Sequence, residues 1–337
     1  RGANVTVDNP ALTRLDRLRQ DAWRPYEVSA DVHGPYSDAI YMPGPIALHG
    51  KRQMADLFYD ANGDGIGAAL LRRSDAISRV DRVKRPIRPA TVLRGTWWFG
   101  GYVFKAFGHN ISEGMSRLWA PNSHGLAGTM LKKDRLQLVF VDVTKHGLSE
   151  ADIARFRETV QLFLRTDADI HILKRHACRI ETLLVPDADL EYPFGISPML
   201  HVTHGTYRRN RLTEIENGRL EGKITAPKLY LSRSKLGRDG TASDFREITN
   251  EPEIETVFAD HGYTVVHPQD LSMREQIDLY LRARVMAGPN GSALHNCIFS
   301  LDCTAVIQLL TPPRIWGGAK LQNTLCQFLG IRQIDLA

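Results

Sequence analysis

Three short apolar runs in the last third of the chain limit the fold more than any other feature. They cover residues 229–231, 263–266 and 285–287, and each has the length of a buried strand. The segments between them repeat apolar residues at a helical spacing, so only one face of each needs burial. The pattern predicts a βαβαβ unit with parallel strands.

The third predicted strand ends in a turn that suits an anion. This turn runs from Gly288 to Ser292, and a helix is expected to begin near its last residue. The N–H groups at the start of a helix attract negative charge, so a diphosphate is the expected ligand. Arg233 and Lys235 follow the first predicted strand, at the edge where open α/β sheets bind ligands, and would supply positive charge. A glycine-serine turn before a helix is a weak signal when it stands alone.

Five segments of this half occur in a specific order: residues 230–234, 246–251 and 262–263, the predicted helix around Gln276, and residues 288–296. This order resembles the C-terminal half of glycosyltransferase family 61, and in particular its bacterial capsular-polysaccharide members. Two positions differ from the family pattern, because Asn290 stands where His is common and Gln308 stands where Glu is common.

Residues 91–119 predict a strand that runs into Gly100 and Gly101 and continues as an amphipathic helix. One face of this helix is apolar. The opposite face carries His109, Glu113, Ser116 and Arg117. From periodicity alone, this polar face is expected to be exposed to solvent.

Parts of the same segment are similar to the N-terminal signature of family 61, namely Phe107-Gly108-His109, Glu113 and residues 117–119. The resemblance implies that the segment faces an active cleft. His109 would then take a proton from the acceptor hydroxyl, and Glu113, one helical turn away, would orient the imidazole. Asp142, at the end of a predicted strand, is a second candidate carboxylate. The alternative for Asp142 is that it caps the following turn.

The fold implied by the resemblance is α/β of the GT-B type, with two Rossmann-like domains facing a cleft. We expect an acceptor-side domain over residues 1–200, whose first 50 residues are irregular or contain β-structure, and a crossover over residues 201–226. A nucleotide-sugar domain follows over residues 227–315, and a helix within residues 316–337 is expected to pack back toward the first domain.

Alternating patterns predict a parallel sheet in the first domain as well. Strands are expected at residues 136–143, 170–173 and 180–185, with a helix at 150–164. In the crossover, Val202-Thr203 favours extended chain around His201 and His204, which argues against a metal site there.

The resemblance implies an inverting glycosyltransferase that moves a hexosyl or pentosyl group from a nucleoside-diphosphate sugar, with UDP preferred, to a hydroxyl of a glycan acceptor in bacterial polysaccharide synthesis. The expected donor contacts are Arg233, Lys235, Asn250, Glu251, Asn290, Gly291, Ser292 and Gln308. For Asn250 and Glu251 the alternative is helix capping before Pro252. Two other interpretations stay open: a nucleotide-sugar-binding protein of the same fold without turnover, and an enzyme that acts on another nucleotide-linked or phosphorylated substrate.

The sequence predicts neither a metal site nor a cofactor other than the donor substrate. Asp167-Ala168-Asp169 and Asp187-Ala188-Asp189 look like surface turns, not like the Asp-x-Asp site of a metal-dependent transferase. Residues 60–65 resemble the opening of a calcium loop, but its twelfth position is Leu71, so a tight turn between strands is expected. The four cysteines lack Cys-x-x-Cys spacing, which argues against a zinc site or a disulfide framework.

Composition and charge are those of an ordinary globular protein. Apolar residues make up 43% and charged residues 24% of the 337 residues, and no apolar run approaches the length of a membrane helix. The formal charge is +5, with basic runs at residues 79–88 and 208–211. These runs predict a solvated face, or contact with an anionic polymer or with a membrane surface that carries a lipid-linked acceptor. Nucleic acid is not an expected partner, because aromatic residues are not interleaved with the basic ones.

Three Asn-x-Ser/Thr sequons, at Asn4, Asn110 and Asn290, bear on the compartment. A glycan at either of the last two would block the expected cleft. We therefore expect a bacterial protein that works in the cytoplasm or at the inner face of the membrane.

Overall fold

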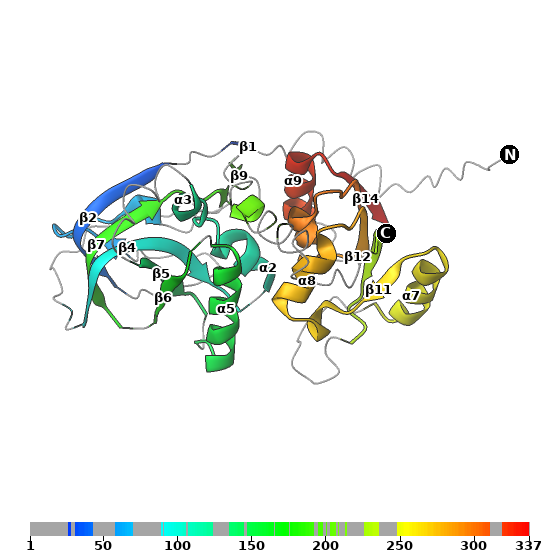
Figure 1. The fold of residues 1–337 in the computed structure, drawn as a ribbon, viewed down its shortest axis with the longest axis horizontal. Coiled ribbons are helices and arrows are strands. Elements are labelled where there is room, and N and C mark those ends of the chain that lie inside the picture. Colours follow the sequence, from blue (N-terminus) through cyan, green and yellow to red (C-terminus); the bar gives the residue numbers. More distant parts are fainter. Residues whose placement is uncertain are drawn as a thin grey trace. The chain divides into compact units, whose positions relative to one another are not determined.

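The computed structural model of the chain divides into two compact units. We call Glu27–Thr225 with Leu271–Leu281 the mixed-sheet unit, and Arg1–Tyr26, Ala226–Asp270 and Arg282–Ala337 the parallel-sheet unit. Figure 1 shows the elements of both. The structure describes residues 26–27, 31–42, 58–69, 89, 91–105, 107–123, 135–144, 147–164, 166–174, 176–191, 195–197, 200, 203–206, 208, 213, 226–235, 248–310 and 319–336.

The mixed-sheet unit is built on a six-stranded sheet with the strand order β3-β2-β7-β4-β5-β6. The strands are β2 (Val32–Tyr41), β3 (Phe58–Tyr59), β4 (Thr91–Val103), β5 (Leu136–Asp142), β6 (Ala168–Leu173) and β7 (Cys178–Pro186). The predicted strands at 136–143, 170–173 and 180–185 are confirmed, and β7, β4, β5 and β6 run parallel. The parallel arrangement predicted for these strands is therefore confirmed. The sheet as a whole is mixed, because β2 pairs antiparallel with both β3 and β7.

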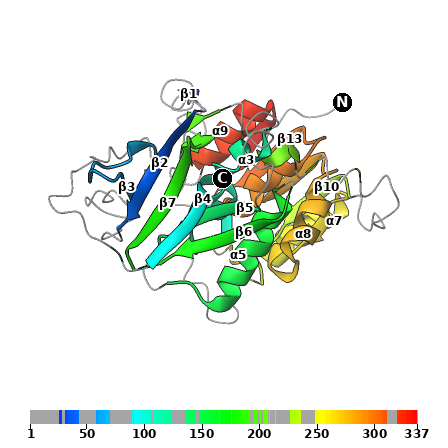
Figure 2. The same cartoon turned by 60° about the vertical axis from the view of Figure 1, so that its left-hand side comes forward.

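This sheet is curled rather than flat (Figure 2). The long strand β4 pairs with β7 over its first half and with β5 over its second half, and the register shifts twice, between Leu93 and Thr96 and between Phe99 and Gly101. Such irregularities bend a strand and increase its twist. The curl brings Tyr41 to the end of β6, where its hydroxyl donates to the carbonyl oxygen of Lys174 at 2.8 Å.

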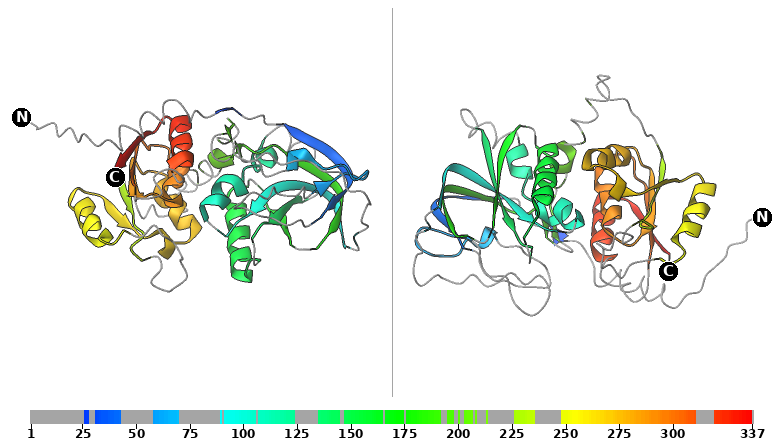
Figure 3. Two further views of the ribbon diagram at one scale, coloured as in Figure 1. Left: turned by 180° about the vertical axis from the view of Figure 1, so that it is seen from behind. Right: turned by 90° about the horizontal axis from the view of Figure 1, so that it is seen from below.

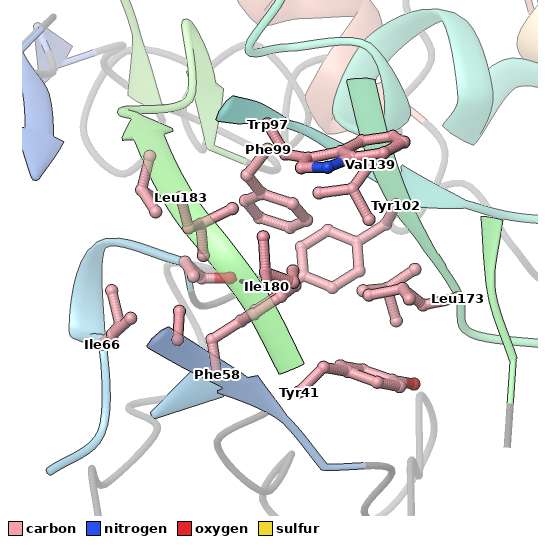
Figure 4. Packing of buried hydrophobic residues seen from close by; sticks show 14 of the residues in the cluster. Tyr41, Phe58, Ile66, Trp97, Phe99, Tyr102, Val139, Leu173, Ile180 and Leu183 are labelled. Carbon is pink, nitrogen blue, oxygen red and sulfur yellow. Dashed lines mark hydrogen bonds between the residues drawn. The ribbon is translucent and has the colours of Figure 1, made fainter. Parts of the chain in front are cut away.

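An aromatic cluster fills the core of the mixed-sheet unit (Figure 4). The ring centroids of Phe58 and Phe99 lie 5.0 Å apart, and Tyr102 meets Phe99 edge to face at 5.3 Å. Because these rings are almost completely buried, their hydrophobic contribution favours the curled arrangement over an open sheet.

Helix α5 (Glu150–Leu162) confirms the helix predicted at 150–164. It begins with a capping box between Ser149 and Asp152, in which each side chain accepts from the backbone of the other residue. Its apolar face packs on the sheet, where Phe156 meets Phe140 edge to face at 5.0 Å. Helix α8 (Met273–Tyr280) groups with this unit and contacts α5.

The parallel-sheet unit has five strands in the order β11-β10-β12-β13-β14, all parallel. They are β10 (Lys228–Leu231), β11 (Thr264–Val266), β12 (Val285–Pro289), β13 (Ala305–Leu309) and β14 (Arg332–Leu336). The three strands predicted from the apolar runs are therefore confirmed. Helices α7 (Glu251–Asp260) and α9 (Ala319–Leu329) lie on opposite sides of this sheet (Figures 1 and 3).

Strand β14 is an element that the sequence analysis missed. It carries Arg332, Gln333 and Asp335 and is only partly buried, so it lacks the apolar run of the inner strands. It lies at an edge of the sheet, and an edge strand tolerates polar side chains because one of its sides is unpaired.

Smaller segments confirm some predictions and contradict others. Strand β1 (Tyr26–Glu27) forms a small sheet with β9 (Gly195–Ile196) and β8 (Leu190–Glu191). The turn predicted at residues 60–65 is confirmed, since a carboxylate oxygen of Asp60 accepts from the backbone N–H groups of Asn62 and Asp64. The extended chain predicted around His204 is wrong, because residues 203–206 are helical.

Several predicted features lie outside the described residues: Asn4, Leu71, the basic run at residues 79–88, His201 and residues 209–211. Arg208, the described residue of the second basic run, is partly buried, and its burial lowers the pKa of the guanidinium. Across the described part of the chain, no helix has the length and apolar character needed to cross a membrane.

Candidate functional site

The first group of candidate residues begins where β4 ends. Residues 107–109 form a short helix, α2 (Phe107–His109), and residues 110–114 continue it as a π-helix, η2 (Asn110–Gly114). The predicted amphipathic α-helix is thus replaced by a wider turn, in which the N–H of Met115 donates to the carbonyl oxygen of Asn110. The Asn110 side chain holds the approach to this turn, because it accepts from the backbone N–H of Phe104 and donates to the carbonyl oxygen of the same residue, both at 2.8 Å.

Glycines let this turn lie directly on β4. A Cβ added at Gly101 would lie 2.2 Å from the carbonyl oxygen of Gly114, and one added at Gly114 would lie 2.7 Å from the carbonyl oxygen of Tyr102. The two backbones therefore approach more closely than any side chain would allow. Gly101 also has a φ of 125°, which other residues rarely adopt.

His109 and Glu113 form a hydrogen-bonded pair on this turn. Nδ1 of His109 lies 2.5 Å from Oε1 of Glu113. Glu113 is buried, with 1% of its side chain exposed, whereas 37% of the His109 side chain is exposed. An ionised carboxylate only accepts hydrogen bonds, so the pair places a proton on Nδ1 and leaves the lone pair on Nε2. In this tautomer His109 can take up a second proton only at Nε2.

Apart from His109, the polar face of residues 109–117 is buried, so the solvent exposure expected from periodicity is wrong for Glu113, Ser116 and Arg117. Glu113, Ser116 and Arg117 are all at most 3% exposed. Pro186 at the end of β7 contacts Arg117, and Asp189 just after it contacts Ser116. Arg117 donates through Nη1 to the carbonyl oxygen of Pro186, and its guanidinium lies 5.0 Å from the centre of the Phe99 ring.

Asp187 and Asp189, which follow β7, are not in a surface turn as predicted. The backbone N–H of Asp189 donates to the carbonyl oxygen of Ser116 at 2.6 Å. Asp189 is fully buried, its Oδ2 accepts from the Thr203 hydroxyl at 2.7 Å, and its Oδ1 has no hydrogen-bond partner in the described part of the chain. Burial raises the pKa of Asp189 well above its usual range, although Thr203 and the charge of Arg117 oppose this.

Asp187 is held by a different set of contacts. Its Oδ1 lies 2.9 Å from Nε2 of His33 on β2, and its Oδ2 accepts from the backbone N–H of Asp31 at 3.1 Å. Its carbonyl oxygen accepts from Nε1 of Trp119. Sequence reasoning missed both aspartates, because the contacts that bury them come from distant segments.

Asp142, the second candidate carboxylate, caps the turn after β5. Its Oδ1 accepts from the backbone N–H of Thr144 at 2.8 Å and from the Thr144 hydroxyl at 2.6 Å. This is the structural alternative considered for Asp142, and its catalytic role stays a prediction.

The second group of candidates lies at the carboxyl edge of the parallel sheet. The chain passes from β10 to β11 on one side and then returns to β12 on the other side, so the strand order reverses between β10 and β12. Open α/β sheets bind ligands in the crevice at such a reversal. Arg233 follows β10, and the turn from Asn290 to Ser292 follows β12, so the topology brings these candidates to the same place.

Glu251 ties α7 to the end of β10. It is 2% exposed, and its Oε1 accepts from the backbone N–H of Arg233 at 2.8 Å and from the Tyr230 hydroxyl at 3.3 Å. Burial raises the pKa of Glu251, while these two hydrogen bonds lower it. The contacts fix the backbone from which Arg233 extends.

Two further candidates of this group are exposed. Nζ of Lys235 donates to Oδ2 of Asp270 at 2.7 Å, so part of its charge is already neutralised. Asn250 is the N-cap residue of α7, as the capping alternative predicts, but its side chain makes no capping hydrogen bond.

The turn after β12 leads into a 3₁₀-helix, η4 (Ser292–Phe299), where an α-helix was expected. Asn290 is 7% exposed, and its backbone N–H donates to the carbonyl oxygen of Leu309. The first N–H groups of any helix lack intrahelical partners, so η4 presents donors next to Gly291 and Ser292. Gln308 is 1% exposed, and its Nε2 has no hydrogen-bond partner within the described ranges.

Cysteines and metal ligands give no further site. None of the four cysteines, all of which are described, forms a disulfide, and three of them are buried. The described residues contain no group of three or more His, Cys, Asp or Glu side chains arranged to hold a metal ion. The expected independence from metal stays a prediction.

Comparison with known proteins identifies one family. The family described as Glycosyltransferase 61 matches residues 107–307, which is more than half of the chain and includes both groups of candidate residues except Gln308. No curated protein shows significant similarity to the chain.

Proposed function

The chain belongs to glycosyltransferase family 61, and we propose that it transfers a sugar with inversion from a UDP-sugar to a hydroxyl of a glycan acceptor. The observation that carries the proposal is the hydrogen bond between Nδ1 of the partly exposed His109 and the buried carboxylate of Glu113. This arrangement is the one that a general base needs, because Glu113 fixes the tautomer and Nε2 accepts the proton.

In the proposed reaction the acceptor oxygen attacks the anomeric carbon while the bond from that carbon to the diphosphate breaks. The acceptor proton passes to Nε2 of His109, and Glu113 stabilises the imidazolium that forms. A positioned base of this kind contributes about 10²- to 10⁴-fold to the rate. The nucleoside diphosphate leaves with the electrons of the broken bond.

We assign the leaving diphosphate to the parallel-sheet unit. Arg233 and the first N–H groups of η4 supply positive charge at the reversal of strand order. Asn290 and Gln308 are buried polar side chains near the ends of β12 and β13, and we assign them to the donor as well. The proposal needs no metal ion, because these groups neutralise the diphosphate.

We also propose that the acceptor is a glycan or a lipid-linked glycan of bacterial polysaccharide synthesis, used in the cytoplasm or at the inner face of the membrane. This assignment is supported by the basic character of the chain, with its formal charge of +5, since positive charge favours an anionic surface.

Release of UDP from UDP-sugars, with and without glycan acceptors, tests the function. We expect turnover by the wild-type protein, loss of about 10²-fold or more in His109→Ala, and wild-type rates in His261→Ala. His261 is a suitable control because it lies at the end of α7, where Nδ1 contacts the carbonyl oxygen of Val257. Equal rates in both variants would refute the role of His109. UDP binding without any turnover would instead identify a binding protein.

A further inference from the structure

A hollow of about 360 Å³ lies in the mixed-sheet unit, outside the two groups of candidate residues. It is bordered by α5, by the end of β6 and by the starts of β4 and β7, where the curl of the sheet brings these elements together. None of its lining residues belongs to residues 107–119 or 186–189. Its volume falls within the range of pockets that hold small molecules.

The polar lining of this hollow is mainly basic. Arg157 comes from α5, His171 from β6, and Lys174 and His176 from the turn that follows β6. Glu150 is the acidic residue among the described lining residues, and its carboxylate lies 3.8 Å from Nζ of Lys174. Positive charge therefore reaches the hollow from α5 and from the turn after β6, and Glu150 supplies the negative charge among the described lining residues.

His171 is the least exposed of these basic residues. Its imidazole meets the Trp97 ring edge to face at 6.0 Å, which holds the ring at the wall of the hollow. Burial lowers the pKa of His171, and the positive charge of Arg157 lowers it further by a smaller amount. An anion placed between His171 and Arg157 would reverse the second effect and favour the imidazolium.

We propose that this hollow binds the phosphate group of a small phosphorylated molecule, with Arg157, His171 and Lys174 as its ligands. Arginine and lysine are the side chains that recognise phosphate oxygens, through charge-assisted hydrogen bonds. The volume exceeds that of one phosphate, and Ile153 and Ile172 provide apolar walls for the rest of the molecule. This site is independent of the proposed glycosyl transfer, because it contains no residue assigned to that reaction.

Titration calorimetry with inorganic phosphate and with glucose 6-phosphate tests the proposal, and glucuronate serves as the carboxylate control. We expect both phosphates to bind, glucose 6-phosphate more tightly, and glucuronate to bind least. Arg157→Gln should weaken phosphate binding about tenfold. Arg155→Gln should change it by less than about twofold, because Arg155 lies on the same helix but lines a different hollow, and solvent screens its charge.

Titration of the histidine signals by NMR gives a second readout that does not depend on catalysis. The pKa of His171 should rise when phosphate is added, whereas the chemical shifts of the His261 ring should not respond to phosphate. Absence of phosphate binding, or equal loss in Arg157→Gln and Arg155→Gln, would overturn the site. Binding of glucuronate as tight as that of phosphate, or weaker binding of glucose 6-phosphate than of inorganic phosphate, would overturn the assigned ligand.

Discussion

The backbone N–H of Asp189 donates to the carbonyl oxygen of Ser116 at 2.6 Å, and this bond joins the end of β7 to the turn that carries His109 and Glu113. Arg117 strengthens the connection by donating to Pro186. The candidate base is therefore held by two features. Strand β7 lies inside the sheet, and the Glu113 side chain is buried and hydrogen-bonded to His109.

Replacing Glu113 should impair catalysis through the orientation of His109. In Glu113→Gln the amide can donate to Nδ1, which favours the tautomer that carries its proton on Nε2 and cannot accept another. We expect about a 10²-fold lower rate of transfer, with little change in the KM for the donor. Steady-state kinetics on both substrates will measure this. An unchanged rate would show that Glu113 only supports the fold.

Asp189 should make stability depend on pH in a defined direction. Its pKa is raised in the folded state, so folding favours the protonated form. The contribution of protonated Asp189 to the free energy of unfolding is complete below the unfolded pKa of about 4, and it is lost as the pH rises toward the folded pKa. Asp189→Asn cannot ionise and keeps an oxygen for the Thr203 hydroxyl. The free energy of unfolding of Asp189→Asn, measured relative to that of the wild type, should therefore increase as the pH rises from about 4 to about 8. Urea denaturation at several pH values measures the difference, and a constant difference contradicts the prediction.

Substitution at Gly101 should be far more damaging than substitution at another glycine of positive φ. Gly101→Ala places a Cβ 2.2 Å from the carbonyl oxygen of Gly114, so η2 must move away from β4. We expect a loss of about 3 kcal/mol or more in the free energy of unfolding. Gly147→Ala is the matched control, because its φ is 78° and its Cβ would meet no atom of the described residues within 4 Å. It should lose only about 1–2 kcal/mol. Equal losses would mean that the close approach is unimportant.

Arg233 and Lys235 should differ in their effect on donor binding. Lys235 is exposed and already bonded to Asp270, so Lys235→Ala should weaken UDP binding by less than about threefold. Arg233 extends from backbone that is fixed by Glu251, and Arg233→Ala should weaken binding about tenfold or more. Calorimetry with UDP compares the two variants. A larger effect at Lys235 would shift the diphosphate away from Arg233.

Removal of divalent metal ions should leave the transfer rate unchanged. Arg233 and η4 are expected to neutralise the leaving diphosphate without a metal. Turnover measured after dialysis against a chelator, and again after Mn²⁺ is restored, tests this expectation. Activity that returns only with Mn²⁺ would require a different donor site.

Local patterns predicted much of the parallel-sheet unit. The apolar runs at 229–231 and 285–287 mark β10 and β12, because inner strands of a parallel sheet are buried on both faces. The run at 263–266 marks β11, an edge strand that is nevertheless apolar in sequence. Helix α9 follows its helical period. Strand β14 was missed, since an edge strand does not require an apolar run.

The mixed-sheet unit was predicted less well, because long-range packing decides it. The period of residues 107–118 suggested an α-helix with an exposed polar face. In the structure, part of the segment is a π-helix packed on β4, and the polar face is buried except at His109. Asp187-Ala188-Asp189 has the composition of a turn, and only the distant Ser116, Thr203 and His33 determine where its carboxylates lie.

The π-helix η2 also sets a limit on how this protein can change length. The hydrogen bond from Met115 to Asn110 spans five residues, one more than the bond of an α-helix, and each residue of an α-helix rotates the chain by about 100°. Deleting a single residue from 110–114 should therefore rotate His109 about the helix axis relative to Arg117, which its bond to Pro186 holds in place. The number of residues that separates the imidazole from the guanidinium is thus itself a requirement of the site.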